Sequence, residues 1–219
     1  MKVSVIVPTK DEPRVGELIK AIHKALDKWK HEVIIVDKSA SPPSVGDALI
    51  IRQKSNGVGK AILEGFENSS GDVIVMMNGD FSHDPRDLCC LLRMITECDI
   101  VIGSRYVPGG RSSDTLYRKF VSQAFRFLAK SILGLSVADP LSGFSALRPE
   151  VLSSLSLNPI GFKIMMETLY KVKGKHLRTV EVPIVFNKRR FGRSKAGVAE
   201  GLRTLLFIIK LRLEHYERQ

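Results

Sequence analysis

Short apolar runs alternate with helical patterns through the first half of the chain. The β-branched run at residues 3–7 stops at Pro8, as expected of a strand buried in a parallel sheet. Apolar residues then recur at helical spacing over residues 15–29. By the same criteria we predict further strands at 33–36, 49–51, 73–77 and 100–103, and helices at 59–66 and from Asp84 onward. This alternation predicts an α/β fold with a mostly parallel sheet flanked by helices.

The second half is less regular. Helical spacing covers residues 116–135 and 198–213, and residues 180–186 alternate like a strand in which Pro183 favours an edge or a bulge. We predict one domain over residues 1–197 and an amphipathic C-terminal helix within 198–219. Cations beside the apolar run 205–209 suit a helix lying in a membrane interface. A terminal helix packed on the domain explains the same pattern equally well.

Composition narrows the class of protein. With 44% hydrophobic and 26% charged residues the chain is globular, and no apolar run approaches the roughly 18 residues that span a bilayer. We expect no secretory signal, and we expect the three cysteines to be reduced core thiols of a cytosolic-type chain. Residues 1–110 hold 14 Lys or Arg against 15 Asp or Glu, whereas residues 111–219 hold 20 against 8. The second half is therefore expected to meet an anion, which could be nucleic acid, phospholipid or a phosphorylated substrate.

Asn78-Gly79-Asp80 follows a buried strand, at the edge of an α/β sheet where ligands bind. An acidic turn in that place can hold Mg²⁺ or Mn²⁺ that bridges two phosphates. Taken alone, the triplet is more often a solvated turn. His83 is expected to be a loop or capping residue instead of a ligand.

Two further segments suit phosphate. Gly57-Val58-Gly59-Lys60 resembles a phosphate cradle but lacks the full spacing, so a glycine-permitted loop entering a helix is favoured. Residues 188–195 place five cations in eight residues and could neutralise a pyrophosphate, although a solvated basic loop is as good an explanation. Only Phe191 interleaves with these cations, so nucleic acid is not expected as a partner.

Two acidic residues complete the candidates. Glu167 lies among apolar neighbours and could make an ion pair or a ligand contact, although the exposed face of a helix is the favoured interpretation. Asp139 could be a plain Asp-Pro turn, but Ser142 and Gly143 after it suit close approach of a ligand.

Read in order, these segments resemble the family 2 glycosyltransferases of GT-A fold, and within them the dolichyl-phosphate mannose synthases. The resemblance covers roughly residues 3–197, with Gly103–Gly110 nearly verbatim. The other motifs lie at residues 5–12, 36–37, 56–66, 78–83, 139–144, 161–167 and 189–195. Such a resemblance implies inverting transfer of mannose from GDP-mannose to a polyprenyl phosphate such as dolichyl phosphate. It also implies a location on the cytoplasmic face of a membrane.

The resemblance also assigns roles. It implies a metal site of Asn78, Asp80 and Ser82. It implies phosphate-handling residues for the donor diphosphate and the acceptor phosphate, which together with Asp80 are the catalytic candidates: Arg105, Arg189 and Lys195, with Ser194 beside them. The remaining substrate-binding candidates are Pro8, Glu12, Asp37, Gly57, Lys60, Asp139, Ser142 and Glu167. Because the acceptor is already an anion, no strong general base is required.

Two residues depart from the family pattern. Lys38 replaces a usual Asp, which keeps open a glucosyltransferase that uses UDP-glucose and the same lipid acceptor. Asn78 replaces the first Asp of a D-x-D motif, which removes a negative charge and is expected to weaken metal binding. A sugar-nucleotide binder with an impaired metal site is therefore a further alternative.

Overall fold

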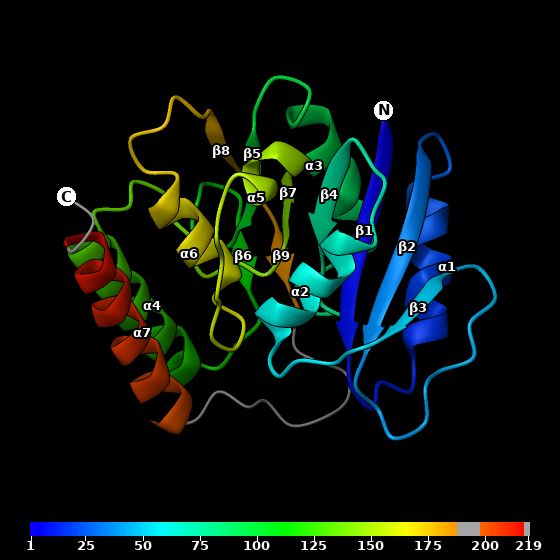
Figure 1. Cartoon of the computed structure of the whole chain (residues 1–219), viewed down its shortest axis with the longest axis horizontal. Helices are drawn as coiled ribbons and strands as arrows, with labels where there is room; N and C mark the ends of the chain where they lie inside the picture. Colours follow the sequence, from blue (N-terminus) through cyan, green and yellow to red (C-terminus); the bar gives the residue numbers. More distant parts are fainter. Residues whose placement is uncertain (188–197, 217–219) are drawn as a thin grey trace.

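The computed structural model describes residues 1–187 and 198–216 (Figure 1). The strands are Lys2–Thr9 (β1), Lys30–Asp37 (β2), Leu49–Arg52 (β3), Val73–Met76 (β4), Ile100–Ser104 (β5), Arg111–Ser112 (β6), Ser145–Leu147 (β7), Thr179–Pro183 (β8) and Val185–Phe186 (β9). The helices are Val15–Ala25 (α1), Val58–Glu67 (α2), the 3-10 turn Pro85–Asp87 (η1), Leu88–Met94 (α3), Leu116–Leu133 (α4), Pro149–Ser153 (α5), Ile164–Lys171 (α6) and Val198–Tyr216 (α7). The predicted alternation of strands and helices is confirmed.

Seven strands form one sheet in the order β3-β2-β1-β4-β7-β5-β8. Every neighbouring pair is parallel except those of β7, which runs antiparallel to both β4 and β5. The mostly parallel sheet is therefore confirmed, while β7 was not predicted. The predicted strand at 180–186 is two strands, and β8 lies at the sheet edge, where a strand tolerates Pro183.

Each face of the sheet has its own apolar core. On β1, Val5 and Val7 belong to the core under α1 and α3, whereas Ile6 belongs to the core under α2, α6 and α7. Because both faces are covered, the strands are apolar on both sides, which explains the continuous apolar runs in the sequence. Among the cysteines, Cys98 is buried as predicted, whereas Cys90 is exposed and so is not a core thiol.

A carboxylate ties the starts of β1, β2 and β4 together. Glu32 accepts hydrogen bonds from Lys2 Nζ at 2.6 Å, Ser4 Oγ at 2.6 Å and the Ser70 main-chain N–H at 2.8 Å. Burial alone would raise the pKa of Glu32, but these hydrogen bonds outweigh burial and lower it from 4.5 to about 2. The pairing of the strands at this end therefore depends on an ionised carboxylate.

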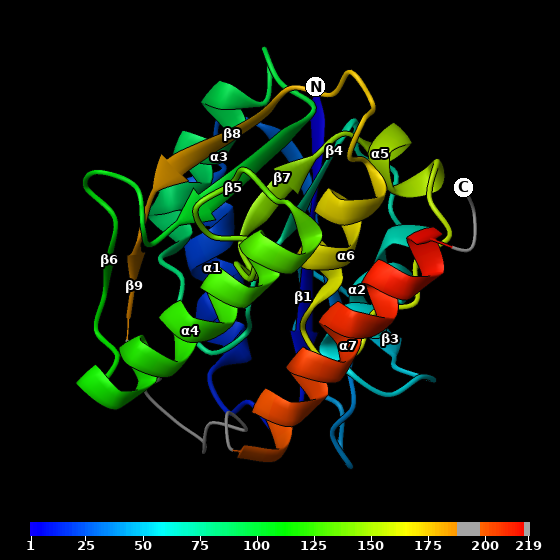
Figure 2. The ribbon, with the colours of Figure 1, turned by 90° about the vertical axis from the view of Figure 1, so that its left-hand side faces the viewer.

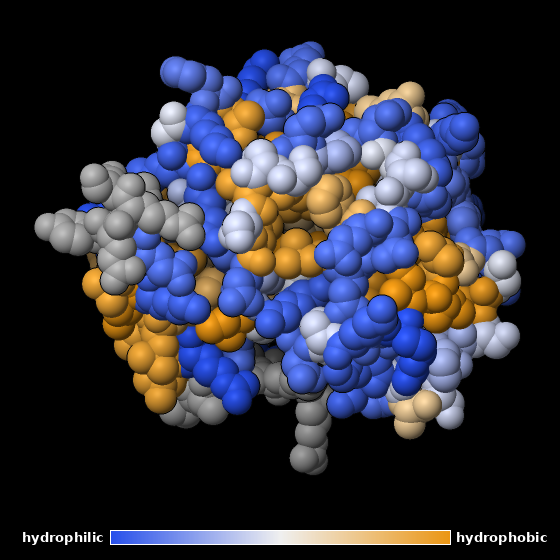
Figure 3. All heavy atoms as spheres, viewed as in Figure 1, coloured by the Kyte–Doolittle hydropathy of each residue, from blue (hydrophilic) through white to orange (hydrophobic). Residues whose placement is uncertain are grey.

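Helices α4 and α7 pack side by side at one flank of the domain (Figures 1 and 2). Phe207, Ile208 and Leu211 bury one side of α7 in the core, whereas Leu206 and Leu213 are 57% and 59% exposed. The space-filling view shows apolar surface at this flank (Figure 3). The C-terminal helix is thus packed on the domain and also exposes apolar side chains. In the part of the chain that the structure describes, no helix is both long and apolar enough to cross a bilayer.

Candidate functional site

The carboxyl ends of β1, β2, β4 and β5 meet at one edge of the sheet. From β1 the chain moves outward through β2 and β3 on one side, and then returns to place β4 on the other side of β1. Such a reversal of strand order leaves a crevice where open α/β sheets bind ligands. Its two borders are the segment after Thr9 and the turn after Met76.

The Asn78-Gly79-Asp80 turn lies on this crevice. Asp80 Oδ1 accepts hydrogen bonds from the main-chain N–H and the hydroxyl of Ser82, at 3.0 and 2.5 Å, and Asn78 Nδ2 lies 3.3 Å from Ser82 Oγ. The three predicted metal ligands are therefore neighbours. Ser82 is fully buried and its hydroxyl donates a hydrogen bond to Asp80. In this structure Ser82 therefore orients the Asp80 carboxylate.

The oxygen donors of this turn fit a hard divalent cation. Asp80 supplies a carboxylate and Asn78 an amide oxygen, and both side chains are partly accessible. No group of three or more His, Cys, Asp or Glu residues that could hold a metal occurs among residues 1–187 and 198–216. Mg²⁺ and Mn²⁺ sites commonly combine one or two carboxylates with substrate phosphate, so the donor set suits a metal whose coordination a phosphate completes.

His83 lies against the Asn78–Asp80 turn from within the core. Its Nδ1 lies 3.4 Å from the main-chain nitrogen of Asn78, and its ring stacks on Phe144 with the centroids 4.9 Å apart. The side chain is 2% exposed. His83 lies between β4 and η1, which agrees with the prediction of a loop residue.

The segment Asp139–Phe144 underlies both the metal turn and β5. A Cβ added at Gly143 would stand 3.0 Å from Asn78 Oδ1, so the absence of a side chain at Gly143 lets Asn78 approach closely. The Ser142 hydroxyl donates to the Gly103 carbonyl at 2.6 Å and is buried. A substrate contact for Ser142 stays a prediction, and the structure shows a residue that fixes the loop.

Arg105 and Asp139 form a buried, two-pronged ion pair. Arg105 Nε and Nη2 donate to Asp139 Oδ2 and Oδ1 at 2.7 and 2.8 Å, and Asp139 is 1% exposed. Burial lowers the pKa of Arg105, but hydrogen bonds to Asp139 and its charge outweigh burial and raise the pKa further. Asp139 therefore holds Arg105 in place, and its own predicted contact with substrate stays a prediction.

Two residues that sequence reasoning missed flank this pair. The Tyr106 ring contacts two guanidinium groups, whose carbons lie 5.2 Å (Arg105) and 4.3 Å (Arg126) from its centroid, and its hydroxyl lies 2.9 Å from Ser122 Oγ on α4. These contacts of Tyr106 with Arg126 and Ser122 hold α4 beside the site. The aromatic residue directly after Arg105 was the available signal, but the partner on α4 is distant in sequence.

On the other side of the crevice, Asp37 ends β2 with its carboxylate fully engaged. Its oxygens accept hydrogen bonds from Thr9 Oγ1, the Ser39 N–H and hydroxyl, and Arg52 Nη1, all within 2.9 Å. Asp37 is 1% exposed, so it holds the loops after β1 and β2 together. Contact of Pro8, Glu12 or Asp37 with a nucleoside stays a prediction. Lys38 reaches the Ser55 carbonyl at 2.5 Å.

The glycine-rich segment enters α2 as the favoured interpretation predicted. Gly57 precedes the helix with a φ of 101°, a backbone conformation that suits glycine. The Gly59 N–H donates to the Gly161 carbonyl at 2.6 Å, so one of the donors at this helix start already has a protein partner. Phosphate contacts of Gly57 and Lys60 stay predictions.

Glu167 contradicts the favoured interpretation of an exposed helix face. It is 1% exposed, and Oε1 accepts hydrogen bonds from Lys171 Nζ at 2.6 Å and the Asn158 N–H at 2.9 Å. The ion-pair alternative is confirmed. The favoured interpretation fails because α6 is buried on nearly every side. A helix of this kind has no exposed polar face for Glu167 to occupy.

Arg189, Ser194 and Lys195 lie outside the described residues. The residue before this segment, Asn187, donates its main-chain N–H to the Ser82 carbonyl at 2.8 Å. Asn187 therefore lies beside the metal turn, and the next described residue is Val198 at the start of α7.

Two mannosyltransferases are similar in sequence to most of this chain. A dolichol-phosphate mannosyltransferase of Pyrococcus furiosus is 40% identical over 210 residues, which are 89% of this chain and 59% of that protein. This chain thus spans less than two thirds of that relative's length. An undecaprenyl-phosphate mannosyltransferase of Micrococcus luteus is 31% identical, with 89% of this chain and 87% of that protein covered.

Solved structures show the same fold. Glucosyl-3-phosphoglycerate synthase of Mycobacterium tuberculosis, crystallised with Mn²⁺ and UDP-glucose, superposes with a TM-score of 0.72 at 18% identity, over 96% of this chain and 78% of that one. The GT-A fold is therefore confirmed. The family model described as glycosyl transferase family 2 matches residues 4–156. With this match and the two mannosyltransferase relatives, the chain belongs to glycosyltransferase family 2.

Proposed function

We propose that this protein transfers mannose from GDP-mannose to a polyprenyl phosphate such as dolichyl phosphate, with inversion at the sugar and with Mg²⁺ or Mn²⁺. The observation that carries the proposal is the Asp80 turn at the strand-order reversal, which the Asp139–Phe144 segment links to the Arg105–Asp139 pair. The names of the two relatives, which describe mannosyl transfer to dolichol and undecaprenyl phosphates, support the choice of sugar and acceptor.

The reaction requires mainly that the acceptor phosphate is aligned with the anomeric carbon and that the negative charge of the leaving diphosphate is neutralised. An oxygen of the acceptor phosphate bonds to the anomeric carbon while the bond from that carbon to the diphosphate breaks, and GDP leaves with the electron pair. Asn78 and Asp80 would hold the metal, which supplies positive charge to the diphosphate. Asp139 takes two of the five guanidinium donors of Arg105, so the others stay available for phosphate. Arg189, Ser194 and Lys195 are proposed to assist.

The donor nucleoside is proposed to lie over β1 and β2, against Pro8, Glu12 and the loop that Asp37 holds. Gly57 and Lys60, at the start of α2, are proposed to border the same nucleotide. Lys38 is engaged with Ser55 in this region, where the family usually has an acidic residue. Discrimination between GDP and UDP is therefore the part of the proposal that the assay must resolve first.

We propose that the flank made by α4 and α7 binds the cytoplasmic surface of a membrane. Large apolar side chains there are 57–85% exposed: Leu116, Phe120 and Phe127 on α4, and Leu202, Leu206 and Leu213 on α7. Exposed cations accompany them, including Arg118 and Lys210. Apolar side chains beside cations suit an anionic lipid surface, and such a surface also holds the lipid acceptor.

One assay panel tests the reaction. GDP-mannose, UDP-glucose and UDP-GlcNAc are each offered with polyprenyl phosphate, and with Mg²⁺, Mn²⁺ or EDTA. We expect a lipid-linked mannose from GDP-mannose, lost in EDTA. Product from UDP-glucose alone would show that the protein is a glucosyltransferase and not a mannosyltransferase. Absence of product from every donor would refute the enzyme hypothesis and favour a sugar-nucleotide binding protein.

The metal site has its own test. Asn78→Asp adds a carboxylate to the turn, so half-maximal activity is expected at a lower metal concentration than in the wild type. An unchanged metal requirement would show that Asn78 does not face the metal. For the membrane, flotation with anionic vesicles is expected to weaken in Leu206→Ser/Leu213→Ser. It is expected to persist in Leu49→Ser, which removes an equally exposed leucine from β3.

A further inference from the structure

Within residues 1–187 and 198–216, Asp11 and Phe81 are the two non-glycine residues with positive φ, at 52° and 58°. They follow β1 and β4, the two strands that border the crevice. Aspartate tolerates this left-handed conformation, but a bulky side chain is strained in it. Strain of this kind persists where the surroundings hold it, and it gathers at functional sites. The presence of Phe81 therefore needs a physical reason.

Phe81 stands inside the turn that carries Asp80. Ser82 reaches back to Asp80 Oδ1 with both its main-chain N–H and its hydroxyl, and the left-handed residue between them makes this reversal. Glycine or asparagine would adopt the same backbone with less strain. The backbone alone thus does not explain a phenylalanine here, and the explanation must lie in the ring.

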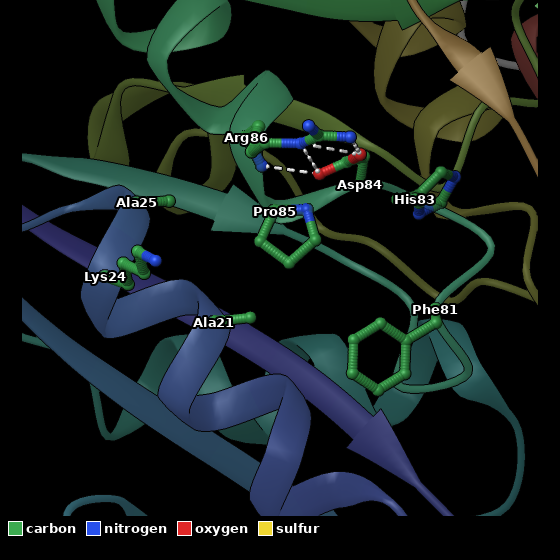
Figure 4. A pocket seen from close by; sticks show the side chains of 8 residues that line it. All are labelled: Ala21, Lys24, Ala25, Phe81, His83, Asp84, Pro85 and Arg86. Carbon is green, nitrogen blue, oxygen red and sulfur yellow. Dashed lines mark hydrogen bonds and ion pairs between the residues drawn. The ribbon is translucent and has the colours of Figure 1, made fainter.

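The ring lies beside the start of helix α1, whose N-cap residue is Arg14. Phe81 packs against the core beneath α1, and the guanidinium carbon of Arg14 lies 5.1 Å from its ring centroid. Figure 4 shows the ring turned toward the helix, where Phe81 lines a cavity of about 440 Å³ together with Ala21 and Ala25. Since α1 follows β1, the ring joins the turn after β4 to the helix after β1, which are the two borders of the crevice.

We infer that Phe81 is a positioning residue for the metal site. Its ring holds the strained turn closed, and the closed turn keeps the Asp80 carboxylate beside Asn78 and at the crevice. This inference rests on the proposed function, because it assumes that Asp80 meets a divalent metal with a nucleoside diphosphate. Residues that orient a ligand without touching the metal commonly govern its affinity.

The test measures binding of Mn²⁺ and GDP by calorimetry, together with the melting temperature. Phe81→Gly removes the ring and frees the turn, so the dissociation constant is expected to rise about tenfold. Phe81→Asn keeps a residue that tolerates the turn but lacks the ring, and it is expected to lose affinity as well. Phe81→Tyr keeps the ring and is expected to bind like the wild type. Arg14→Met keeps Phe81 and is expected to weaken binding by a smaller factor.

Trp29→Gly is the matched control, because Trp29 packs on the same core beyond the far end of α1. It is expected to lower the melting temperature with binding unchanged. Wild-type affinity in Phe81→Gly would overturn the inference, and so would an equal loss of affinity in Trp29→Gly. If the wild type itself bound neither Mn²⁺ nor GDP, the proposed function would fail instead, so the two failures are distinguishable.

Discussion

A buried ion pair attaches the C-terminal helix to the α/β domain. Lys163 Nζ lies 2.5 Å from Glu200 Oε1, with side-chain exposures of 0% for the lysine and 15% for the glutamate. Lys163 precedes α6, and Glu200 lies in the first turn of α7. Because Lys163 is more deeply buried than Glu200, we expect removal of Glu200 to lower the free energy of unfolding more than removal of Lys163 does.

The surroundings set the magnitudes. Glu200→Ala leaves an ammonium group with no exposure, 4.7 Å from the centroid of the Phe162 ring, and an unpaired buried charge costs about 3–5 kcal/mol. Lys163→Met leaves a partly exposed carboxylate with Arg203 3.8 Å away, so we expect a cost of about 1–3 kcal/mol. The double variant Lys163→Met/Glu200→Ala leaves no unpaired charge and is expected to be more stable than Glu200→Ala alone.

Urea and thermal unfolding measure these differences. For a domain of this size, about 3–5 kcal/mol corresponds to a fall in melting temperature of about 6–20 °C. The reasoning is refuted if Lys163→Met is as costly as Glu200→Ala, or if the double variant loses the sum of the two single costs. Either result would mean that the lysine is not held as a buried charge by Glu200.

Three further outcomes are expected. Asp139→Asn takes the negative charge from Arg105, so it should lower both the melting temperature and kcat/KM, measured on the same preparation. The folded-state pKa of Glu32 is below its unfolded value, so its contribution is present above about pH 4.5 and is lost toward pH 2; the acid unfolding profile of Glu32→Gln should lack this component. Gly59→Ala places a Cβ 2.7 Å from the Pro159 ring and should destabilise the fold by about 1–3 kcal/mol in urea.

Sequence patterns revealed what is local and periodic. The buried strands were predictable because both their faces are apolar, as in Val3–Val7. The helical segment from Asp84 onward was predictable because Asp84 bonds to a main-chain N–H only two residues away, at Arg86. The strand β7 was not predictable, since Ser145–Leu147 is too short to show a period. Partners far apart in the chain, such as Arg105 with Asp139, become visible only when the sheet brings them together.

The candidate site divides in the same way. The Asn78–Asp80 turn and the glycines of α2 were recognised because residue type and position at a strand or helix end carry the signal. The burial of Glu167 and Lys163 was missed, because a charged residue normally indicates solvent and nothing nearby in the chain announces its partner. The Phe81 strain was equally hidden, since a phenylalanine gives no hint of a positive φ.

The inverted direction of β7 has a consequence for how this domain can vary. Since β5 ends and β7 begins at the same sheet edge, residues 105–144 leave the sheet and return to their starting point, where the Gly103 N–H donates to the Phe144 carbonyl at 2.9 Å. Insertions are tolerated best where the ends of the exchanged segment already lie together. This excursion carries all of α4, so its length and surface can vary between β5 and β7 without changing the order of the strands, provided that Arg105 and Asp139 near its two ends are kept.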